Sequence, residues 1–294
     1  MQGFLLIDKP EGITSFSAVS KVKRIAKEKR VGHTGTLDPL ATGVLPIFLG
    51  RATALSGILL EAEKEYTATV KLGVTTDTDD ITGNILSEKR VEIKEEELIG
   101  VLARFKGEIL QIPPIYSALK KDGVRLYGLA RRGENVEIEP RKVIISKLEL
   151  RWFCKDSFEI KVVCSKGTYI RSLCRDIGEA LGTGATLTAL RRNETCGFNE
   201  ADCVKLDDLN EENISLFIKN EEWAVEHLSA VSVTEKQAIR FSNGGQLSLD
   251  RLDSVNFFEG ELVRVKHKEH FIGIGIADNK KGLLSIKCII NQFK

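Results

Sequence analysis

The sequence predicts a fold of mixed helices and strands that ends in a small β-rich domain. Residues 64–72 alternate strictly in polarity, which is typical of a strand with one buried face. Residues 95–105 place apolar side chains at the spacing of one helix face. Residues 262–290 show strand patterns separated by short polar turns. A chain of 294 residues has room for a large and a small domain, or for two of medium size.

The N-terminal elements follow from local patterns. Residues 3–7 predict a short buried strand, and residues 8–12 predict a turn because they contain proline and glycine. Thr14 or Ser15 is a suitable N-cap for a helix that runs to about Lys29. Its expected inner face contains Phe16, Val19, Val22 and Ile25. Its outer face is basic.

The next segment, residues 31–43, contains three glycines and one proline, so we predict an irregular loop there. The remaining elements that we predict are a strand at 45–49, a helix from 95 that stops by Gly107, an irregular excursion at 113–142, strands within 143–164, a helix at 168–181, a strand at 187–192 and a helix at 234–242. The acidic segment 205–222 is interpreted as a domain joint. We therefore divide the chain into domains of residues 1–229 and 230–294.

Charge is distributed unevenly along the chain. The formal net charge is only +1, which argues against a protein that coats nucleic acid through bulk charge. Residues 21–30 nevertheless carry six basic residues and one acid, and residues 113–142 carry seven basic residues and four acids. Such clusters can bind phosphates. The alternative is a solvated helix face, which is the commoner role of a single charged run.

Several classes of protein and site are not indicated. No apolar run is long enough to span a membrane, and the N-terminus lacks the basic region of a signal peptide, so we expect a cytoplasmic protein. The six cysteines show no C-x-x-C spacing and are expected to be free thiols. Phosphate-loop, H-E-x-x-H and G-x-S-x-G motifs are absent, and residues 77–82 depart from a calcium loop. The motifs therefore indicate no nucleotide-binding loop and no metal site.

Three residues are candidates for chemistry. Asp38 lies in the glycine-rich loop with His33 and three threonines, although an aspartate before a proline also commonly caps a turn. Arg171 is expected in the first turn of a helix, where a cation is unfavourable without a specific acidic partner or phosphate. An ordinary surface arginine is the alternative. Tyr66 is expected to face inward on its strand, either as a core residue or as part of a site.

Together these segments resemble one family, the bacterial TruB pseudouridine synthases. The resemblance rests on residues 6–15 (LIDKPEGITS), 32–46 (GHTGTLDPLATGVLP), 64–66 (KEY), 76–79 (TDTD), 116–120 (YSALK) and 166–171 (KGTYIR). It covers residues 3 to about 200, and the long Asp38 motif is its most specific part. The C-terminal region resembles a small RNA-binding PUA domain in size and strand pattern.

The resemblance implies an α+β catalytic domain, built on a long and largely antiparallel sheet, that isomerises a uridine in the TΨC loop of tRNA to pseudouridine. It implies no cofactor, no metal and no membrane. As an RNA enzyme with its own RNA-gripping insertion at 113–142, the chain is expected to act as a monomer without an obligatory protein partner. Whether the aspartate attacks as a nucleophile or abstracts the 2′ proton stays open.

The resemblance also implies roles for individual residues. Asp38 corresponds to the catalytic aspartate, Arg171 to the arginine that pairs with it, and Tyr66 to the tyrosine that stacks on the target base. The residues expected to contact substrate or RNA are His33, Lys9, Tyr169, Leu190, Lys23, Arg24, Arg131 and Arg132.

Two rival interpretations stay open. The first is a sister pseudouridine synthase that acts on rRNA or is guided by a separate RNA. The second is a non-catalytic RNA-binding protein that keeps the fold. The combination of Asp38, Arg171 and Tyr66 argues against the second, because a binding protein does not need the carboxylate.

Overall fold

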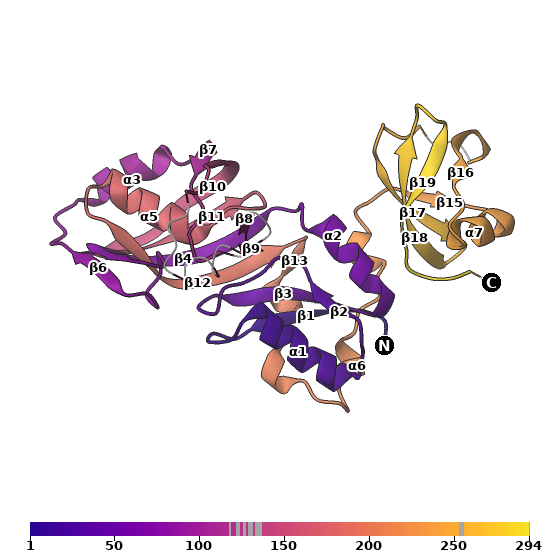
Figure 1. The fold of residues 1–294 in the computed structure, drawn as a ribbon, viewed down its shortest axis with the longest axis horizontal. Coiled ribbons are helices and arrows are strands. Elements are labelled where there is room, and N and C mark those ends of the chain that lie inside the picture. Colours follow the sequence, from indigo (N-terminus) through magenta and orange to yellow (C-terminus); the bar gives the residue numbers. More distant parts are fainter. Residues whose placement is uncertain are drawn as a thin grey trace.

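The computed structural model describes residues 1–117, 119–121, 124–125, 128, 132, 137–252 and 256–293. Figure 1 shows an elongated body that contains the first sheet and a smaller C-terminal body beside the N-terminal end of the chain. The combination of a large sheet, flanking helices and a second β-rich sheet confirms the α+β fold class predicted from the sequence.

The main sheet has ten strands, with β14, β1, β3, β12, β4, β11, β10 and β7 in spatial order, while β2 pairs with β3 and β13 with β12. Two of these pairings, β1 with β14 and β3 with β12, are parallel, and the others are antiparallel. Their bounds are β1 Gly3–Lys9, β2 Val31–His33, β3 Thr42–Leu49, β4 Lys64–Leu72, β7 Gly107–Gln111, β10 Arg141–Cys154, β11 Ser157–Cys164, β12 Ala185–Thr195, β13 Phe198–Asn199 and β14 Val204–Lys205.

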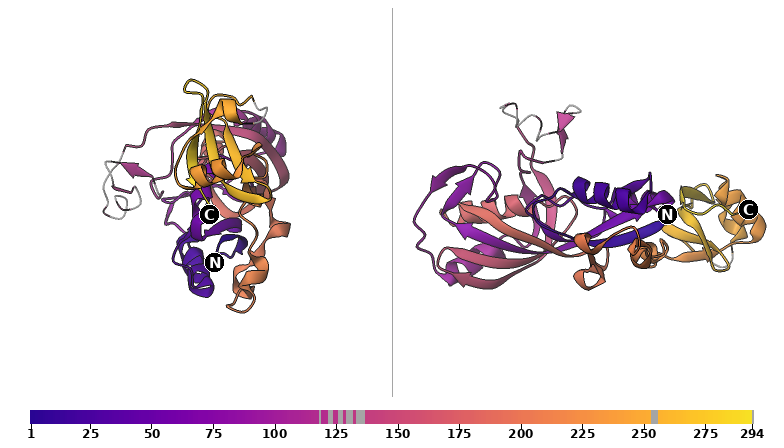
Figure 2. Two further views of the ribbon diagram at one scale, coloured as in Figure 1. Left: turned by 90° about the vertical axis from the view of Figure 1, so that its right-hand side faces the viewer. Right: turned by 90° about the horizontal axis from the view of Figure 1, so that it is seen from below.

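Helices cover one face of this sheet. Apolar side chains of α1, α3 and α5 join the inward-facing residues of the strands in one core, and Figure 2 shows α1 and α5 on the same side of the sheet. The helices are α1 Ser15–Ala26, α2 Ser56–Leu59, α3 Glu95–Ala103, α5 Ile170–Ala180, α6 Ile214–Phe217 and α7 Glu235–Ser242; short 3-10 turns are η1 Gly50–Leu55, η2 Glu200–Asp202, η3 Leu206–Asp208, η4 Trp223–Val225 and η5 Leu249–Arg251.

The C-terminal body is a five-stranded sheet with the order β15, β17, β18, β19 and β16. Two small hairpins complete the strands of the described chain. The bounds are β15 Ala230–Ser232, β16 Leu247–Ser248, β17 Leu262–His267, β18 His270–Asp278 and β19 Leu283–Ile289, with the hairpins β5 Val74–Thr76 and β6 Ile85–Glu88, and β8 Lys120–Lys121 and β9 Val124–Arg125.

Strand β4 agrees with the prediction from periodicity. Tyr66, Ala68, Val70 and Leu72 are all buried, and the residues between them are half-buried. This central strand lies between β12 and β11, so its period of two is set by two paired neighbours and by a core on one face. All six cysteines are free thiols, as expected.

Helix α1 departs from the prediction in two ways. It ends at Ala26 rather than near Lys29, because Lys27 adopts a left-handed backbone with φ of 50° and caps the helix. Phe16 is 77% exposed, so its assignment to the inner face was wrong. The buried face instead begins with Ser15, whose hydroxyl is used for a specific contact described below.

The glycine-rich segment is less irregular than predicted. Residues 31–33 form β2, and β3 begins at Thr42, so only residues 34–41 form the loop. Gly43, the second residue of β3, has a φ of 101°, and a Cβ at this position would lie only 2.2 Å from the carbonyl oxygen of Arg192. The start of β3 therefore requires a glycine here. Gly107 does not end α3, which stops at Ala103, but starts β7.

The acidic segment 205–222 is not a joint. Ile214 is fully buried in the main core, and Phe4 and Lys219 exchange backbone hydrogen bonds of 3.1 and 2.8 Å. The segment therefore packs back along β1 as part of the first body. The two bodies meet in a second core, in which Phe4, Phe48 and Phe198 from the first body share contacts with Phe271 and Ile274 from the second.

Candidate active site

The loop after β2 opens on a pocket of about 260 Å³ at the side of the main sheet. Its walls come from several parts of the chain: the loop 34–41, Leu60 after α2, β4, Ser117, residues 166–171 at the start of α5, and β12. The lining residues are Gly35, Thr36, Leu37, Asp38, Leu60, Lys64, Tyr66, Ser117, Lys166, Gly167, Thr168, Tyr169, Ile170, Arg171, Leu190 and Arg192.

The N-terminal motif holds the Asp38 loop in place. The buried Ser15 hydroxyl donates to the carbonyl of Leu37 at 3.0 Å and accepts from its amide at 2.8 Å. The Gly12 amide donates to the carbonyl of Pro39 at 2.8 Å. The two sequence motifs that carried the family resemblance therefore form one unit, and the first fixes the backbone on both sides of Asp38.

Lys9 acts within the same unit. It is fully buried, and its Nζ donates to the carbonyls of Pro10 and Ile13 at 2.8 Å and of Pro39 at 3.4 Å. Burial lowers the pKa of Lys9 to about 8, although Asp38 opposes this shift. The sequence suggested an RNA contact for Lys9, but this geometry instead assigns it to holding the loop.

Asp38 and Arg171 form an ion pair, with Oδ2 of Asp38 3.0 Å from Nε of Arg171. The Nε–H direction is not aligned for a good hydrogen bond, so the contact is mainly electrostatic. The two side chains differ in exposure, at 40% for Asp38 and 6% for Arg171. The carboxylate therefore faces the cavity, while the guanidinium lies behind it.

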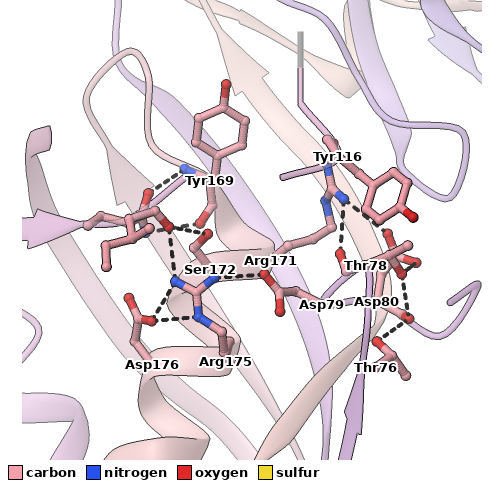
Figure 3. A network of polar contacts seen from close by, with 12 residues as sticks. Thr76, Thr78, Asp79, Asp80, Tyr116, Tyr169, Arg171, Ser172, Arg175 and Asp176 are labelled. Atoms are coloured by element: carbon pink, nitrogen blue, oxygen red, sulfur yellow. Dashed lines mark hydrogen bonds and ion pairs between the residues drawn. The ribbon is translucent and has the colours of Figure 1, made fainter. Parts of the chain in front are cut away.

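Two backbone carbonyls and one carboxylate orient the rest of the Arg171 side chain. Nη1 donates to the carbonyl of Thr78 at 3.0 Å and lies 3.5 Å from Oδ2 of Asp80, and Nη2 donates to the carbonyl of Tyr116 at 2.9 Å (Figure 3). Asp80 is itself held by Thr78 and by both the amide and the hydroxyl of Thr82. Residues 77–82 thus serve as a support for the arginine.

One turn further along α5, Arg175 fixes the helix to the same support. It pairs with Asp79 at 2.9 Å and with Asp176 at 2.8 Å, and it donates to the carbonyl of Ile112 at 2.9 Å (Figure 3). Arg171 and Arg175 therefore lie one turn apart on α5, and Arg171 has the specific partners expected of an arginine near a helix start.

Burial raises the pKa of Asp38 above the ordinary carboxyl value. Arg171 and Lys9 lower it and Asp80 raises it further, but desolvation is the largest influence. The sequence suggested that Arg171 keeps Asp38 ionised. Arg171 does lower the pKa of Asp38, but the opposite effect of desolvation is larger. The carboxyl group is a stronger proton acceptor than an exposed aspartate.

Tyr66 and Leu190 lie together on the pocket wall, on the neighbouring strands β4 and β12. Both are nearly buried, at 8% and 9% exposure, and both still line the cavity. Burial raises the pKa of the Tyr66 phenol, so the hydroxyl is protonated at neutral pH. The structure brings together Asp38, Arg171, Tyr66 and Leu190 as the sequence suggested.

The comparisons with known proteins agree with this geometry. A family model described as TruB family pseudouridylate synthase (N terminal domain) matches residues 23–170, and one described as tRNA pseudouridylate synthase B C-terminal domain matches residues 171–231. The chain is 44% identical over 292 residues to the tRNA pseudouridine synthase B of Clostridium tetani, which covers 99% of this chain and 100% of the relative. The chain belongs to the TruB family of pseudouridylate synthases.

Further similarities cover the whole TruB-family chain. It is 43% identical over 295 residues to the tRNA pseudouridine synthase B of Clostridium perfringens, which covers 99% of this chain and 100% of the relative. A solved structure titled "Structure of H/ACA RNP bound to a substrate RNA containing 2'-deoxyuridine" superposes with a TM-score of 0.76 at 26% identity, over 99% of this chain and 86% of that one.

Other predicted contact residues of the TruB-family chain lie around the pocket. Tyr169 lines it, and its backbone amide and carbonyl are both bonded to the buried Gln111 side chain, at 2.8 and 3.1 Å. His33 lies at the end of β2, outside the set of pocket-lining residues. Burial lowers the pKa of His33, so its ring is neutral at neutral pH, and its Nδ1 lacks a hydrogen-bond partner in the described part of the chain.

The predicted surface contacts of the TruB-family chain are spread more widely. Lys23 and Arg24 are exposed in the last turn of α1. Two other lysines of this basic run pair with the acidic segment, Lys21 with Asp207 and Lys27 with Glu211. Arg132 is exposed, and Arg131 lies outside the described residues. In the described ranges, no group of three or more potential metal ligands occurs, and no helix is long and apolar enough to cross a membrane.

Sequence reasoning missed several residues of this TruB-family site. Arg192 is 1% exposed and is the largest fully buried side chain among the described residues, although it lines the pocket. One signal was available: in the strand pattern of residues 187–192, Arg192 is in phase with the inward-facing Leu190. The supporting contacts of Ser15, Asp80 and Gln111 had no such signal.

Proposed function

We propose that this chain isomerises one uridine in the TΨC loop of tRNA to pseudouridine, with Asp38 as the catalytic carboxylate. The observation that carries the proposal is the Asp38–Arg171 pair, whose carboxylate faces a pocket that also contains Tyr66 and Leu190. The choice of tRNA is supported by relatives at 43–44% identity that are named tRNA pseudouridine synthase B.

The reaction must detach uracil from C1′ at N1, rotate it and rejoin it through C5. A target base has to leave its stack before it can enter a recessed site, which costs a few kcal/mol. Stacking on an aromatic ring returns about 1–3 kcal/mol per base. Tyr66 provides such a ring, and Leu190 provides an apolar wall that helps to exclude water.

Asp38 is suited to either of two steps. It acts as a nucleophile toward the sugar or base, or it abstracts the 2′ proton of the ribose, and both require the ionised carboxylate. The raised pKa makes the carboxylate more basic, and Arg171 stabilises it against complete neutralisation. After the new bond forms, C5 must lose its proton. Because burial keeps the Tyr66 phenol protonated, Tyr66 is suited to orient a water that takes this proton.

We further propose that the chain works alone, as a cytoplasmic monomer without a protein partner or cofactor. The insertion 113–142 and the C-terminal domain 230–294, which we regard as PUA-like, would then supply the remaining RNA contacts. The solved structural relative is titled as part of an RNA–protein complex, so a guided or rRNA-directed synthase is the rival function.

The test uses the purified chain and a full-length unmodified tRNA transcript, followed by mapping of pseudouridine at nucleotide resolution. We expect conversion of a single TΨC-loop uridine by the wild type, and none by Asp38→Asn, which keeps the side-chain shape but lacks the charge. Asp278→Asn, on the surface of the second sheet, is the matched control. Conversion by Asp38→Asn at more than a few per cent of the wild-type rate contradicts the role of Asp38, and conversion only of an rRNA fragment contradicts the choice of tRNA.

A further inference from the structure

Arg192 is a buried charge that has no acidic partner in the described part of the chain. Its side chain is 1% exposed, yet among the described residues no carboxylate lies within ion-pairing distance of the guanidinium. Its neighbour Arg191, on the opposite face of β12, pairs with both Asp8 and Glu200. An isolated charge in a protein interior is costly, so its position requires an explanation.

The first explanation lies in the Asp38 loop. Nε of Arg192 donates to the carbonyl of Val44 at 2.8 Å, and Nη2 donates to the carbonyl of Gly35 at 3.1 Å. Gly35 and Val44 lie on the two sides of the loop. Gly35 itself has a φ of 76°, and a Cβ there would lie 3.1 Å from Nη1 of Arg192. One planar guanidinium therefore joins the two ends of the segment that carries Asp38.

The second explanation lies across the sheet. Arg192 is the direct antiparallel partner of Tyr66, both side chains are buried, and both line the same pocket. Directly paired residues share a face and have Cβ atoms about 4.5–5.5 Å apart. The two side chains therefore lie side by side in the pocket wall, and the positive charge of Arg192 lowers the pKa of Tyr66 against the larger, opposite effect of burial. An arginine only donates hydrogen bonds, so on the side that faces Arg192 the phenol oxygen can only accept, which favours a hydroxyl proton that points elsewhere.

The other charged groups near Arg192 do not cancel its positive charge. Lys64 and Lys9 are also buried near Arg192, and their ammonium groups bond to backbone carbonyls rather than to acids. Asp38 is the acidic residue among those that line the pocket, and Arg171 already pairs with it. The positive charge of Arg192 is therefore available to polarise the Tyr66 hydroxyl.

We propose that Arg192 is a positioning residue that joins the two ends of the Asp38 loop and turns the Tyr66 hydroxyl proton into the pocket, toward a carbonyl oxygen of the substrate uracil. This inference rests on the proposed function, because it takes Tyr66 to face the target base. Tyr66 then holds the base by donating a hydrogen bond during detachment and rotation, in addition to offering its ring.

The first test compares Arg192→Lys with Arg191→Lys under single-turnover conditions. Lysine keeps the charge but lacks the planar fork, so Arg192→Lys should lower the rate of conversion about tenfold or more while the Kd for RNA stays within about twofold. Arg191→Lys keeps a positive charge between Asp8 and Glu200, outside the residues that line the pocket, and should match the wild type. A wild-type rate for Arg192→Lys overturns the proposal, and so does an effect that appears only in Kd.

The second test asks whether Arg192 acts through Tyr66. In a Tyr66→Phe background, Arg192→Lys should cost only about threefold or less, because the hydroxyl that it orients is already absent. Full additivity of the two substitutions overturns the link. If the wild type modifies another RNA but not tRNA, only the choice of tRNA is contradicted. Both comparisons can then be repeated on that RNA.

A third measurement leaves Arg192 unchanged, in case its substitution prevents folding. Substrates with 2-thiouridine or 4-thiouridine at the target position replace one carbonyl oxygen by a weaker acceptor. One of them should slow the wild type about tenfold and leave the rate of Tyr66→Phe nearly unchanged. Equal slowing of both enzymes by each substrate overturns the assignment of the hydroxyl proton to a uracil carbonyl.

Discussion

Charged residues on α5 and on α1 are used in opposite ways. On α5, Arg171 and Arg175 are mostly buried, and each contacts partners from several segments of the chain. On α1 and its C-cap, Lys21 and Lys27 form single ion pairs near solvent, and Lys23 and Arg24 are exposed. Buried charges with many partners fix geometry, whereas exposed charges act mainly through a salt-dependent field.

The largest effect should come from Arg171. Arg171→Met removes the partner of Asp38, raises the carboxyl pKa further and leaves Asp80 without its cation, so single-turnover activity should fall by at least about 100-fold. Arg171→Lys should recover only part of it, since lysine lacks the planar fork. Arg175→Met is the control: it breaks a similar buried network without touching Asp38. It should lower the melting temperature but keep activity within about fivefold. Full activity of Arg171→Lys would show that the pairing geometry is unimportant.

Tyr66→Phe should have the next largest effect. The ring remains, so folding and RNA binding should persist, with the melting temperature changed by only about 2–4 °C. Conversion of uridine should nevertheless be poor, because the hydroxyl is removed. RNA with 5-fluorouridine separates the steps, since C5 then carries no proton to lose. If Tyr66→Phe equals the wild type on ordinary tRNA, the residue serves only as a stacking surface.

The exposed helix should show a smaller effect that depends on salt. Replacing Lys23 and Arg24 by alanine should reduce the slope of log affinity against log salt by about 0.7–0.9 for each phosphate that the protein no longer neutralises. Replacing Lys21 and Lys27 is the matched comparison, because Asp207 and Glu211 already neutralise them. Equal slopes for all variants would identify the whole run as a solvated face.

The smallest effect concerns stability. The folded-state pKa of Asp38 is raised, so the native protein holds this proton more tightly than the unfolded chain does. Ionising Asp38 therefore costs stability as pH rises from the ordinary carboxyl pKa through the raised value. Asp38→Asn avoids this cost and should melt at or above the wild-type temperature at pH 7, with the difference shrinking as pH falls through that window. Thermal melts between about pH 4 and pH 7 test this prediction. If Asp38→Asn melts below the wild type, and the difference in melting temperature stays constant over this range, the stated direction of the Asp38 pKa shift is wrong.

The success of the sequence prediction varied from one element to the next for identifiable reasons. Strand β4 was predicted from end to end, because a central strand between two neighbours follows its side-chain period closely. The end of α1 was predicted three residues too late, since nothing local indicated the left-handed Lys27. Phe16 has the right helical spacing for the core, but the buried face of this helix turns toward Leu37 through Ser15 instead.

The sequence by itself predicted the secondary structure of the central strands and helices and the candidates for the reactive residues, because these predictions depend on local periodicity and on a long motif around Asp38. Only the tertiary structure decided what surrounds them. Arg171 reaches the carbonyl of Thr78, 93 residues away, and that of Tyr116, 55 residues away. Lys9 turned inward to hold the loop, and Arg192, the cross-strand partner of Tyr66, donates a hydrogen bond to that loop. Such partners are fixed by close packing and hydrogen-bond direction in three dimensions, which residue order does not specify.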